Sequence, residues 1–432
     1  MEIYEILVLV LTFVILLSIG VPISFSIGIS SLLTMLLSIN TIPSLTTVSQ
    51  RMATGLDSFA LLAIPFFILA GQLMNSGGIA RRLIDFAKVL VGKMPGGLAF
   101  VNILAAMLFG AISGSAVAAA SAIGGFMTPI MAKEGYDKSF SAAVNITSAT
   151  TGLIIPPSNI LIVYSLASGG VSIAALFLAG YIPGIIFGLS LMVVAFVYAK
   201  KHKYKVNYEF NLGYAVKTFF DALPSLLLII IVIGGIVAGY FTATEASAVA
   251  VLYAFILSVF IYKEIKFKDL PNILLGSAST TAIVMLLVGT SMAMSWVMAY
   301  ENIPQNVAQA LLALSDNKIV ILIIINIILL FIGTFMDMTP AVLIFTPIFL
   351  PVVAQLGVNP IHFGIMMVMN LSVGLCTPPV GSVLFVGCSV ADLPITKVIK
   401  PLIPMFIAMI VALLLVTYIP ELSLFVPQLF GY

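Results

Sequence analysis

The strongest constraint on this chain is its succession of long, uncharged apolar stretches. One of them, residues 319–332, holds a single polar side chain, Asn326. Of all 432 residues, 62% are hydrophobic and 8% are charged, whereas a water-soluble domain has about a quarter of its residues charged. Each bilayer-spanning helix needs about 20 mostly apolar residues. The sequence therefore predicts an all-α polytopic membrane protein of about ten spans, without the period-two alternation of a membrane β-barrel.

The expected spans follow the apolar stretches. We place them at about residues 4–20, 22–39, 59–75, 139–168, 172–199, 223–241, 243–262, 271–300, 361–390 and 401–420. The turn at Gly20-Val21-Pro22 leaves open whether residues 4–39 form two spans or one kinked helix.

Two further apolar stretches, residues 98–131 and 319–352, are interrupted near their middles by small and polar residues. The first contains Ser113-Gly114-Ser115 and the second contains Gly333 and Asp337. We interpret each stretch as a re-entrant hairpin of two short helices with its tip at membrane depth. Such tips persist only where they are buried in protein or face a water-filled cavity.

Basic residues gather in five segments between the expected spans. The clusters are Arg81, Arg82, Lys88 and Lys93; Lys133 and Lys138; Lys200, Lys201, Lys203 and Lys205; Lys263, Lys266 and Lys268; and Lys397 and Lys400. With these spans and hairpins, all five basic clusters fall on one side of the membrane. Segments 40–57, 301–318 and 353–360 fall on the other side. By the positive-inside rule the basic side is cytoplasmic, so both termini are expected in the periplasm.

The chain contains an internal repeat. Gly152-Leu153-Ile154-Ile155-Pro156-Pro157 recurs as Gly374-Leu375-Cys376-Thr377-Pro378-Pro379, at a spacing of 374 − 152 = 222 residues. Each half reads as a span, an amphipathic connector, a hairpin, a broken span and a closing span. In the expected topology the hairpins enter from opposite sides, so the repeats are inverted. Inverted repeats with matching broken helices are typical of secondary transporters.

These repeats suggest a division of the chain into four parts. Residues 1–57 form N-terminal scaffold spans, and residues 58–200 the first repeat. Residues 201–269 hold an amphipathic linker and a scaffold helix pair, and residues 270–432 form the second repeat.

Each Pro-Pro pair should unwind its span, because proline lacks an N–H group and blocks the helix. The freed carbonyls and nearby hydroxyls can bind a small cation, and the positive ends of half-helices can face a carboxylate. Two unrelated proline kinks in a generic bundle are the alternative, and the matching hairpins weigh against it.

Asp337 is the carboxylate that we expect deepest in the membrane, where an ionised group is costly unless it is paired, so it is a candidate functional residue. The alternative is that Asp337 only caps the next helix, through Thr339 and Pro340. Glu245 is better explained as a helix-start carboxylate. The sequence lacks a P-loop and the HExxH, paired-Cys and nucleophile-elbow patterns, so we expect neither an enzyme nor an organic cofactor.

Together these motifs resemble the large membrane subunit of tripartite ATP-independent periplasmic (TRAP) transporters. The resembling segments are Ala63-Ile64-Pro65-Phe66-Phe67-Ile68-Leu69-Ala70-Gly71, Ser113-Gly114-Ser115-Ala116, Gly135-Tyr136-Asp137, Ile155-Pro156-Pro157-Ser158, Ala179-Gly180-Tyr181-Ile182-Pro183-Gly184, Thr244-Glu245-Ala246, Asp337, Thr346-Pro347-Ile348 and Pro378-Pro379-Val380-Gly381. The likeness covers nearly the whole chain. Ala243 and Asn159 depart from it, standing where proline and a branched apolar residue are usual.

The resemblance implies an elevator mechanism, Na⁺ coupling, a small four-helix membrane subunit and a periplasmic substrate-binding protein. It also implies organic-acid substrates, such as C4-dicarboxylates or sialic acid. A stand-alone carrier of the same architecture and a non-transporting membrane protein are the alternatives.

Two sets of candidate site residues follow from the motifs and the resemblance. The candidate substrate-binding residues are Ser113, Ser115, Thr150, Thr151, Asn159 and Asp337. The candidate Na⁺ ligands are Ser113, Gly114, Thr151, Pro156, Ser158, Gly333, Asp337, Thr339, Gly374, Thr377, Pro378 and Gly381.

Overall fold

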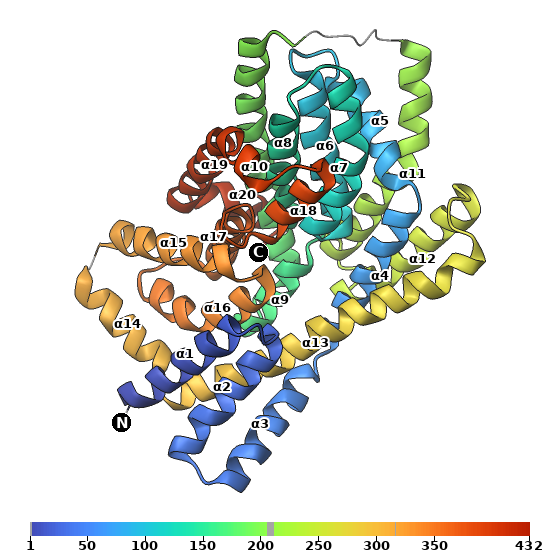
Figure 1. Cartoon of the computed structure of the whole chain (residues 1–432). Coiled ribbons are helices and arrows are strands. Elements are labelled where there is room, and N and C mark those ends of the chain that lie inside the picture. Colours follow the sequence, from blue (N-terminus) through green and yellow to red (C-terminus); the bar gives the residue numbers. More distant parts are fainter. Residues whose placement is uncertain (1, 205–210, 316) are drawn as a thin grey trace.

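Helices are the regular elements of the part of the chain that the computed structural model describes, residues 2–204, 211–315 and 317–432. Lys205, in one of the predicted basic clusters, lies outside these residues. Within the same ranges, nine helical segments are long and apolar enough to cross a membrane. The predicted all-α architecture with many apolar helices is therefore confirmed (Figure 1).

The N-terminal region consists of α1 (Glu2–Ser18), α2 (Ile23–Ser38) and α3 (Thr41–Leu56). Helices α1 and α2 pack along each other, joined by a tight turn at Gly20, whose φ is +86°. Residues 4–39 thus form two helices rather than one kinked helix. Helix α3 was not predicted, because its polar sequence gives a weak span signal.

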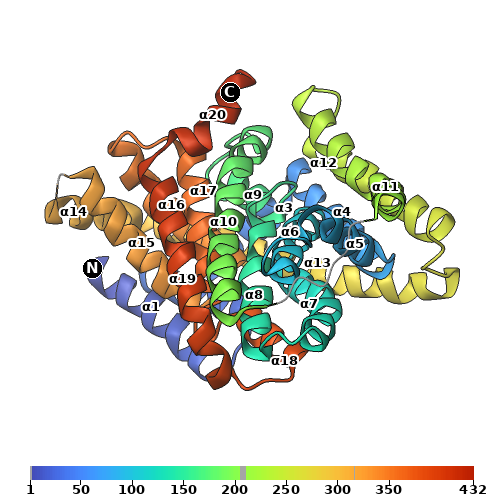
Figure 2. The same cartoon turned by 90° about the horizontal axis from the view of Figure 1, so that it is seen from above.

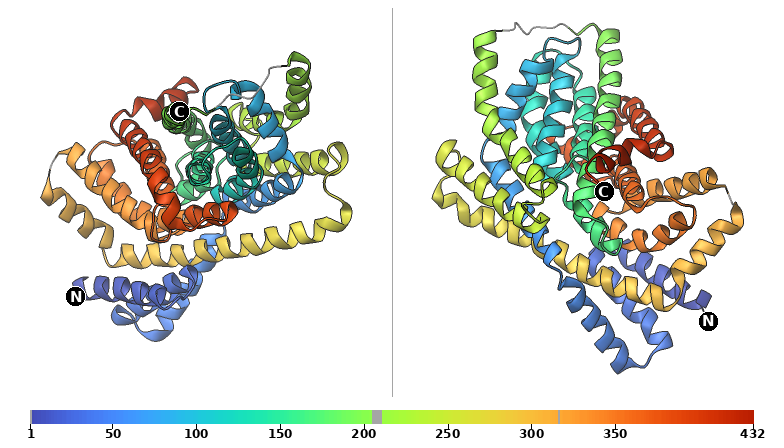
Figure 3. Two further views of the ribbon diagram at one scale, coloured as in Figure 1. Left: turned by 45° about the horizontal axis from the view of Figure 1, so that its top comes forward. Right: turned by 180° about the vertical axis from the view of Figure 1, so that it is seen from behind.

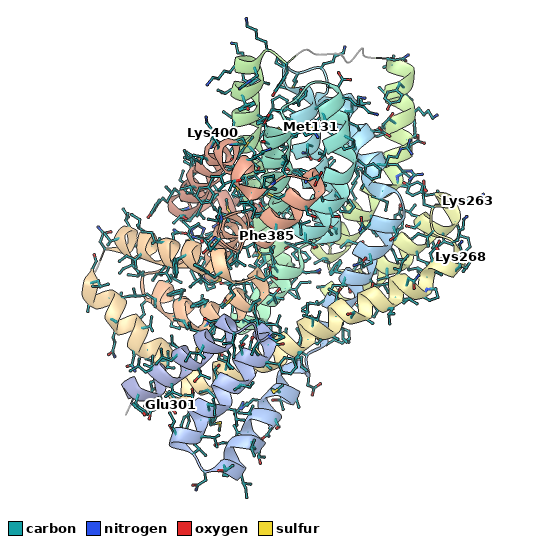
Figure 4. All side chains as sticks on the ribbon, viewed as in Figure 1. Met131, Lys263, Lys268, Glu301, Phe385 and Lys400 are labelled. Carbon is teal, nitrogen blue, oxygen red and sulfur yellow. The ribbon has the colours of Figure 1, made fainter. Side chains whose placement is uncertain are left out.

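Helix α13 (Leu270–Tyr300) is a long helix that runs through the molecule. Its 31 residues make it about 46 Å long at the usual helical rise. Helices α2 and α3 pack on one side of it, and the bulk of the chain lies on the other (Figure 3, left). Lys263 and Lys268 lie at its first end and Glu301 at its last end (Figure 4).

Three more helices lie beside α13, and the first of them packs directly on it. Helix α4 (Ala63–Ser76) follows a short 3₁₀ turn, η1 (Phe59–Leu62), and packs against α12 (Ala243–Phe255). Helix α11 (Leu212–Val237) packs against α12 and starts well before residue 223, where we expected a span to begin.

The rest of the chain is one helix series that occurs twice. In the first half it runs α5 (Ile79–Val91), α6 (Gly97–Ser113), α7 (Ala116–Lys133), α8 (Lys138–Ala149), η2 (Thr150–Leu153), α9 (Asn159–Ala167) and α10 (Ile173–His202). In the second half it runs α14 (Ile303–Leu314), α15 (Lys318–Phe335), α16 (Met338–Gln355), α17 (Pro360–Gly374), α18 (Ser382–Ala391) and α19 (Ile395–Tyr418).

The two series follow the 222-residue spacing seen in the sequence. Helices α7 and α16 begin at Ala116 and Met338, and α10 and α19 begin at Ile173 and Ile395 (338 − 116 and 395 − 173 are both 222). The closing helices α10 and α19 pack side by side (Figure 2). A last helix, α20 (Glu421–Leu429), packs on α10 and was not predicted.

The two hairpins occupy Gly97–Lys133 and Lys318–Gln355, close to the expected residues 98–131 and 319–352. Helices α7, α15 and α16 have 18 residues each, or about 27 Å. Each arm ends at the predicted polar break, because Gly114 in the first hairpin and Met336-Asp337 in the second leave helical geometry.

Candidate functional site

Each hairpin crosses its broken helix at a pair of glycines. Gly110 on α6 meets Gly152 in η2, and a Cβ on Gly110 would lie only 2.6 Å from the Cα of Gly152. In the second half Gly333 meets Gly374, where the corresponding distance is 3.1 Å. Small residues let helix backbones approach this closely. These crossings bring each hairpin tip next to its Pro-Pro loop.

The first tip turns at Gly114, whose φ of +62° suits a residue without a side chain. A Cβ there would also come 3.0 Å from Nδ2 of Asn159, the first residue of α9. The next residue, Ser115, caps α7 by accepting a hydrogen bond from the Ala118 N–H at 3.2 Å. The tip is therefore fixed against the start of α9.

The two tips and the two broken helices line one shared cavity of about 210 Å³. Its polar lining residues are Ser115, Asn159, Asp337, Thr339, Ser382 and Thr280. Helix α4 adds Ile64 and Ile68, and α13 adds Val284 beside Thr280. Residues more than 220 positions apart in the sequence thus meet at one place. The cavity also borders on α13.

Four helices point their N-terminal ends at this cavity. They are α7, α9, α16 and α18, whose first residues or caps line it. The N-terminus of a helix carries free N–H groups and a partial positive charge, so it attracts anions. Among the described lining residues there is no Lys, Arg or His. A carboxylate in this cavity would therefore be held by backbone N–H groups and side-chain amides or hydroxyls.

Asp337 is solvent-accessible and lines the cavity beside Thr339 and Ser382. It occupies the N-cap position of α16, yet its carboxylate makes no capping hydrogen bond. The structure thus does not show the purely capping role that we considered. The carboxylate interacts with the Ser382 side chain, although the buried Ser382 Oγ has no partner at full hydrogen-bond geometry. Both groups are therefore available to a ligand.

Other predicted side chains point away from the cavity. Thr150 and Thr151 are fully buried and donate to the carbonyls of Thr147 (2.9 Å) and Ser148 (2.6 Å). Ser113 and Ser158 are also buried and donate to nearby carbonyls. The remaining predicted ligands lie in the glycine crossings and Pro-Pro loops, outside the cavity lining: Pro156, Gly333, Gly374, Thr377, Pro378 and Gly381.

The two Pro-Pro loops differ in their surroundings. Residues 154–158 of the first loop are buried, and Pro157 lies against α11 and α4. In the second loop Pro378, Pro379 and Val380 are exposed. Both Pro-Pro peptide bonds are cis.

Sequence reasoning did not identify Thr280 as a cavity residue. It lies inside an expected span without any break, so only the packing of α13 places it there. A second missed feature is a buried polar chain, in which Asn370 donates to Asn326 Oδ1 at 2.8 Å and Asn326 donates to Thr417 at 3.3 Å. His362 is also buried, and its Nδ1 lies 2.7 Å from the Ser423 hydroxyl oxygen.

Glu245 has the structural role that we expected. It forms a capping box with Thr242 at the start of α12, in which the Thr242 N–H donates to Glu245 Oε2 at 2.8 Å. Its carboxylate is committed to the helix and lies outside the cavity.

Structural comparison supports the fold. The chain resembles the crystal structure of the YdaH transporter of Alcanivorax borkumensis, with a TM-score of 0.65 at 13% identity, covering 88% of this chain and 89% of that one. At this identity the likeness concerns the fold alone.

Sequence comparison gives the family. The model of the tripartite ATP-independent periplasmic transporter DctM component matches residues 10–422. An uncharacterized protein, YgiK of Salmonella typhimurium, is 58% identical over 99% of this chain and 98% of its own length. The C4-dicarboxylate TRAP transporter large permease DctM of Rhodobacter capsulatus is 39% identical (95% and 96% covered). The sialic acid TRAP transporter large permease SiaM of Vibrio cholerae is also 39% identical (96% of each covered). The chain therefore belongs to the TRAP transporter family, as a large membrane subunit.

Proposed function

We propose that this subunit carries an organic acid into the bacterial cell across the inner membrane, driven by the Na⁺ gradient. The observation that carries the proposal is the shared cavity, where four helix N-termini converge beside the free carboxylate of Asp337. The N-termini suit an anion, and Asp337 suits a cation. One cavity can therefore hold an acid and its coupling ion together.

The donor set around Asp337 suits Na⁺, a hard cation that prefers oxygen ligands. Thr339 and Ser382 add hydroxyl oxygens, and the Ser382 oxygen is buried without a fixed partner. The unwound loops after Gly152 and Gly374 add carbonyls, as in other secondary transporters with broken helices. We keep Asp337 and Thr339 as the central ligands, with the glycine crossings and Pro-Pro loops supplying the others.

Size favours a compact substrate. The cavity volume of about 210 Å³ is about the volume that seven water molecules occupy in the liquid. It lies below the roughly 300–1,000 Å³ of pockets that bind drug-sized ligands. Relatives that transport a C4-dicarboxylate and sialic acid are equally identical to this chain, so identity does not decide between them. We infer an acid of C4-dicarboxylate size rather than one as bulky as sialic acid.

Transport by an elevator movement fits this arrangement. Both hairpins and both broken helices would move as one body past α13 and α4, which supply the other wall of the cavity. We further propose that the hairpins are re-entrant and inverted, that the basic clusters face the cytoplasm, and that both termini face the periplasm. A small four-helix membrane subunit and a periplasmic binding protein would complete the transporter.

Uptake in proteoliposomes tests the proposal. The chain would be reconstituted with its small membrane subunit and periplasmic binding protein. Uptake of labelled succinate would be measured with an inward Na⁺ gradient, with K⁺ in its place, and without the binding protein. We expect accumulation only with Na⁺ and all components. Equal uptake in K⁺ would refute Na⁺ coupling. Uptake by the chain alone would favour a stand-alone symporter, and failure of a whole panel of organic acids would favour a non-transporting role.

A further inference from the structure

A second, apolar cavity lies between the N-terminal helix and the second hairpin, with a volume of about 850 Å³. We call it the α1 crevice. One wall is α1, including Val10, Phe13 and Val14, and the facing wall includes Phe335 on α15 and Phe345 on α16. Phe335 and Val10 are each 51% exposed, so the crevice opens at the surface of the chain.

The equivalent place in the first half is closed. There the cavity is only about 10 Å³, between α11, α4 and the first Pro-Pro loop. Its lining follows the repeat, since Met74 and Leu228 there correspond to Met298 and Ile6 in the α1 crevice (298 − 74 = 224; 228 − 6 = 222). The same position in the fold is therefore filled by side chains in the first half and left as an open cavity in the second.

Backbone contacts show the same difference. In the first half the hairpin presses on its neighbouring helix, since a Cβ on Gly71 of α4 would lie 2.8 Å from the Ser113 carbonyl oxygen. In the second half, Phe335, the counterpart of Ser113 (335 − 113 = 222), faces α1 across the crevice. Val380 in the second Pro-Pro loop also lines the crevice and is 47% exposed, whereas its counterpart Ser158 is fully buried.

The lining chemistry determines what can fill the crevice. Ser18 is the one polar residue among the lining residues, and its hydroxyl already donates to the Val14 carbonyl at 2.7 Å. Water is unfavourable in such a space, because it needs two to four polar partners. A polar solute would likewise lose its hydrogen bonds. Hydrocarbon is the occupant that costs nothing in hydrogen bonds, and bilayer lipid surrounds helices of this composition.

We propose that the α1 crevice is a binding site for the acyl chain of a membrane phospholipid. The chain takes, in the second half, the place that α11 side chains fill in the first. A bound acyl chain keeps the second hairpin apart from α1, so it stabilises the conformation seen here, with the second half open. This site is separate from the shared cavity, so the proposal does not depend on the transported solute.

Photocrosslinking tests the site directly. The full chain with its small subunit is placed in phosphatidylethanolamine vesicles in which some acyl chains carry a diazirine, irradiated, digested and mapped by mass spectrometry. We expect adducts on Phe13, Phe335 and Phe345, and none on Leu228 or Ile229, which line the closed counterpart. Adducts only on outward residues such as Val193 and Val197, which are 62% and 60% exposed, would overturn the proposal.

A filling variant provides the matched control. Val10→Trp places a ring in the crevice and should reduce labelling of Phe335 about tenfold, because overpacking opposes the bound chain. Val193→Trp, on the exposed face of α10, should leave that labelling unchanged. Val14→Trp, on the same wall, replaces Val10→Trp if the first variant does not fold. Equal labelling of Phe335 in all variants would refute the site, as would its replacement by crosslinks to the small subunit.

Discussion

The two hairpin tips occupy the same position in the repeat but use it differently. Ser115 and Asp337 are 222 residues apart (337 − 115), and each is the N-cap of the second arm of its hairpin. The Ser115 hydroxyl caps α7, whereas the Asp337 carboxylate leaves α16 uncapped and faces the cavity. One half thus uses the position for helix capping, and the other half places a carboxylate at the cavity instead.

The same contrast runs through the packing of the halves. The first glycine crossing is tighter than the second, and the first Pro-Pro loop is buried while the second is exposed. The two copies of the repeat can therefore be closed in one half and open in the other with nearly the same element series. The following predictions test that difference, beginning with the largest expected effect.

The charge at the second tip should matter most. Asp337→Asn keeps the shape of the side chain and removes its charge, so Na⁺-dependent uptake in proteoliposomes should fall about 100-fold or more, since removing one partner of a charge pair in such a site costs about 3–5 kcal/mol. Ser115→Ala at the equivalent position should reduce uptake far less. Similar losses in both variants would mean that the tips are functionally alike.

The glycine crossings should differ in tolerance. Gly110→Ala should destabilise the fold by about 1–3 kcal/mol through overpacking, because its Cβ would lie 2.6 Å from the Gly152 Cα. Gly333→Ala should cost less than about 1 kcal/mol, because the distance at its crossing is 3.1 Å and the clash is smaller. Both variants gain equally in helix propensity, so that gain does not affect the comparison. Thermal unfolding of the two purified variants measures both losses of stability. A larger loss in Gly333→Ala than in Gly110→Ala would contradict a tighter crossing in the first half.

Loss of the cap should separate the tips in stability as well. Ser115→Ala removes an observed capping bond and should cost about 1 kcal/mol, whereas Asp337→Ala removes none and should leave the melting temperature in Na⁺-free buffer nearly unchanged. A larger loss of stability in Asp337→Ala would restore the capping role for that carboxylate.

The smallest expected effect concerns the connector of the first half. Arg82 on α5 lies 3.6 Å from Glu264 and stacks 3.7 Å above the Tyr262 ring, which ties α5 to the segment after α12. Arg82→Gln should lower stability by only about 0.5–1 kcal/mol, because Glu264 is exposed. Thermal unfolding in low and high salt tests this, with Lys201→Gln on the exposed end of α10 as the control. An unchanged melting temperature in both buffers would show that Arg82 does not anchor α5 in the closed half.

Much of the architecture could be predicted because breaks in membrane helices have local causes. Gly114, with its φ of +62°, and the Pro-Pro pairs at 156–157 and 378–379 interrupt helices, and the Pro-Pro signal occurs in both halves. The hairpins, the broken helices and the position of Asp337 at a tip followed from these residues. Helix α3 did not follow, because its polar sequence gives no span signal.

The cavity was predictable only in part. Tip and loop residues such as Ser115, Asn159 and Asp337 could be expected to converge, but their directions could not. Thr150 and Thr151 have the same residue type and neighbourhood as cavity hydroxyls, yet they bond to their own helix. Thr280 enters through the course of α13, which no local pattern indicates. No local sequence pattern indicates the difference between a closed and an open half either.

The four helix ends around the cavity have a consequence for acidity. Backbone N–H groups do not titrate, and Asp337 is the one ionisable side chain among the described residues that line the cavity. A transporter that used lysine or histidine to hold its solute would change its affinity whenever those groups lost a proton. In the proposed binding site, external pH would act on binding through Asp337 or through the acid itself. A cell in surroundings of variable acidity would therefore bind a fully ionised acid with an affinity that depends on a single carboxylate among the described lining residues.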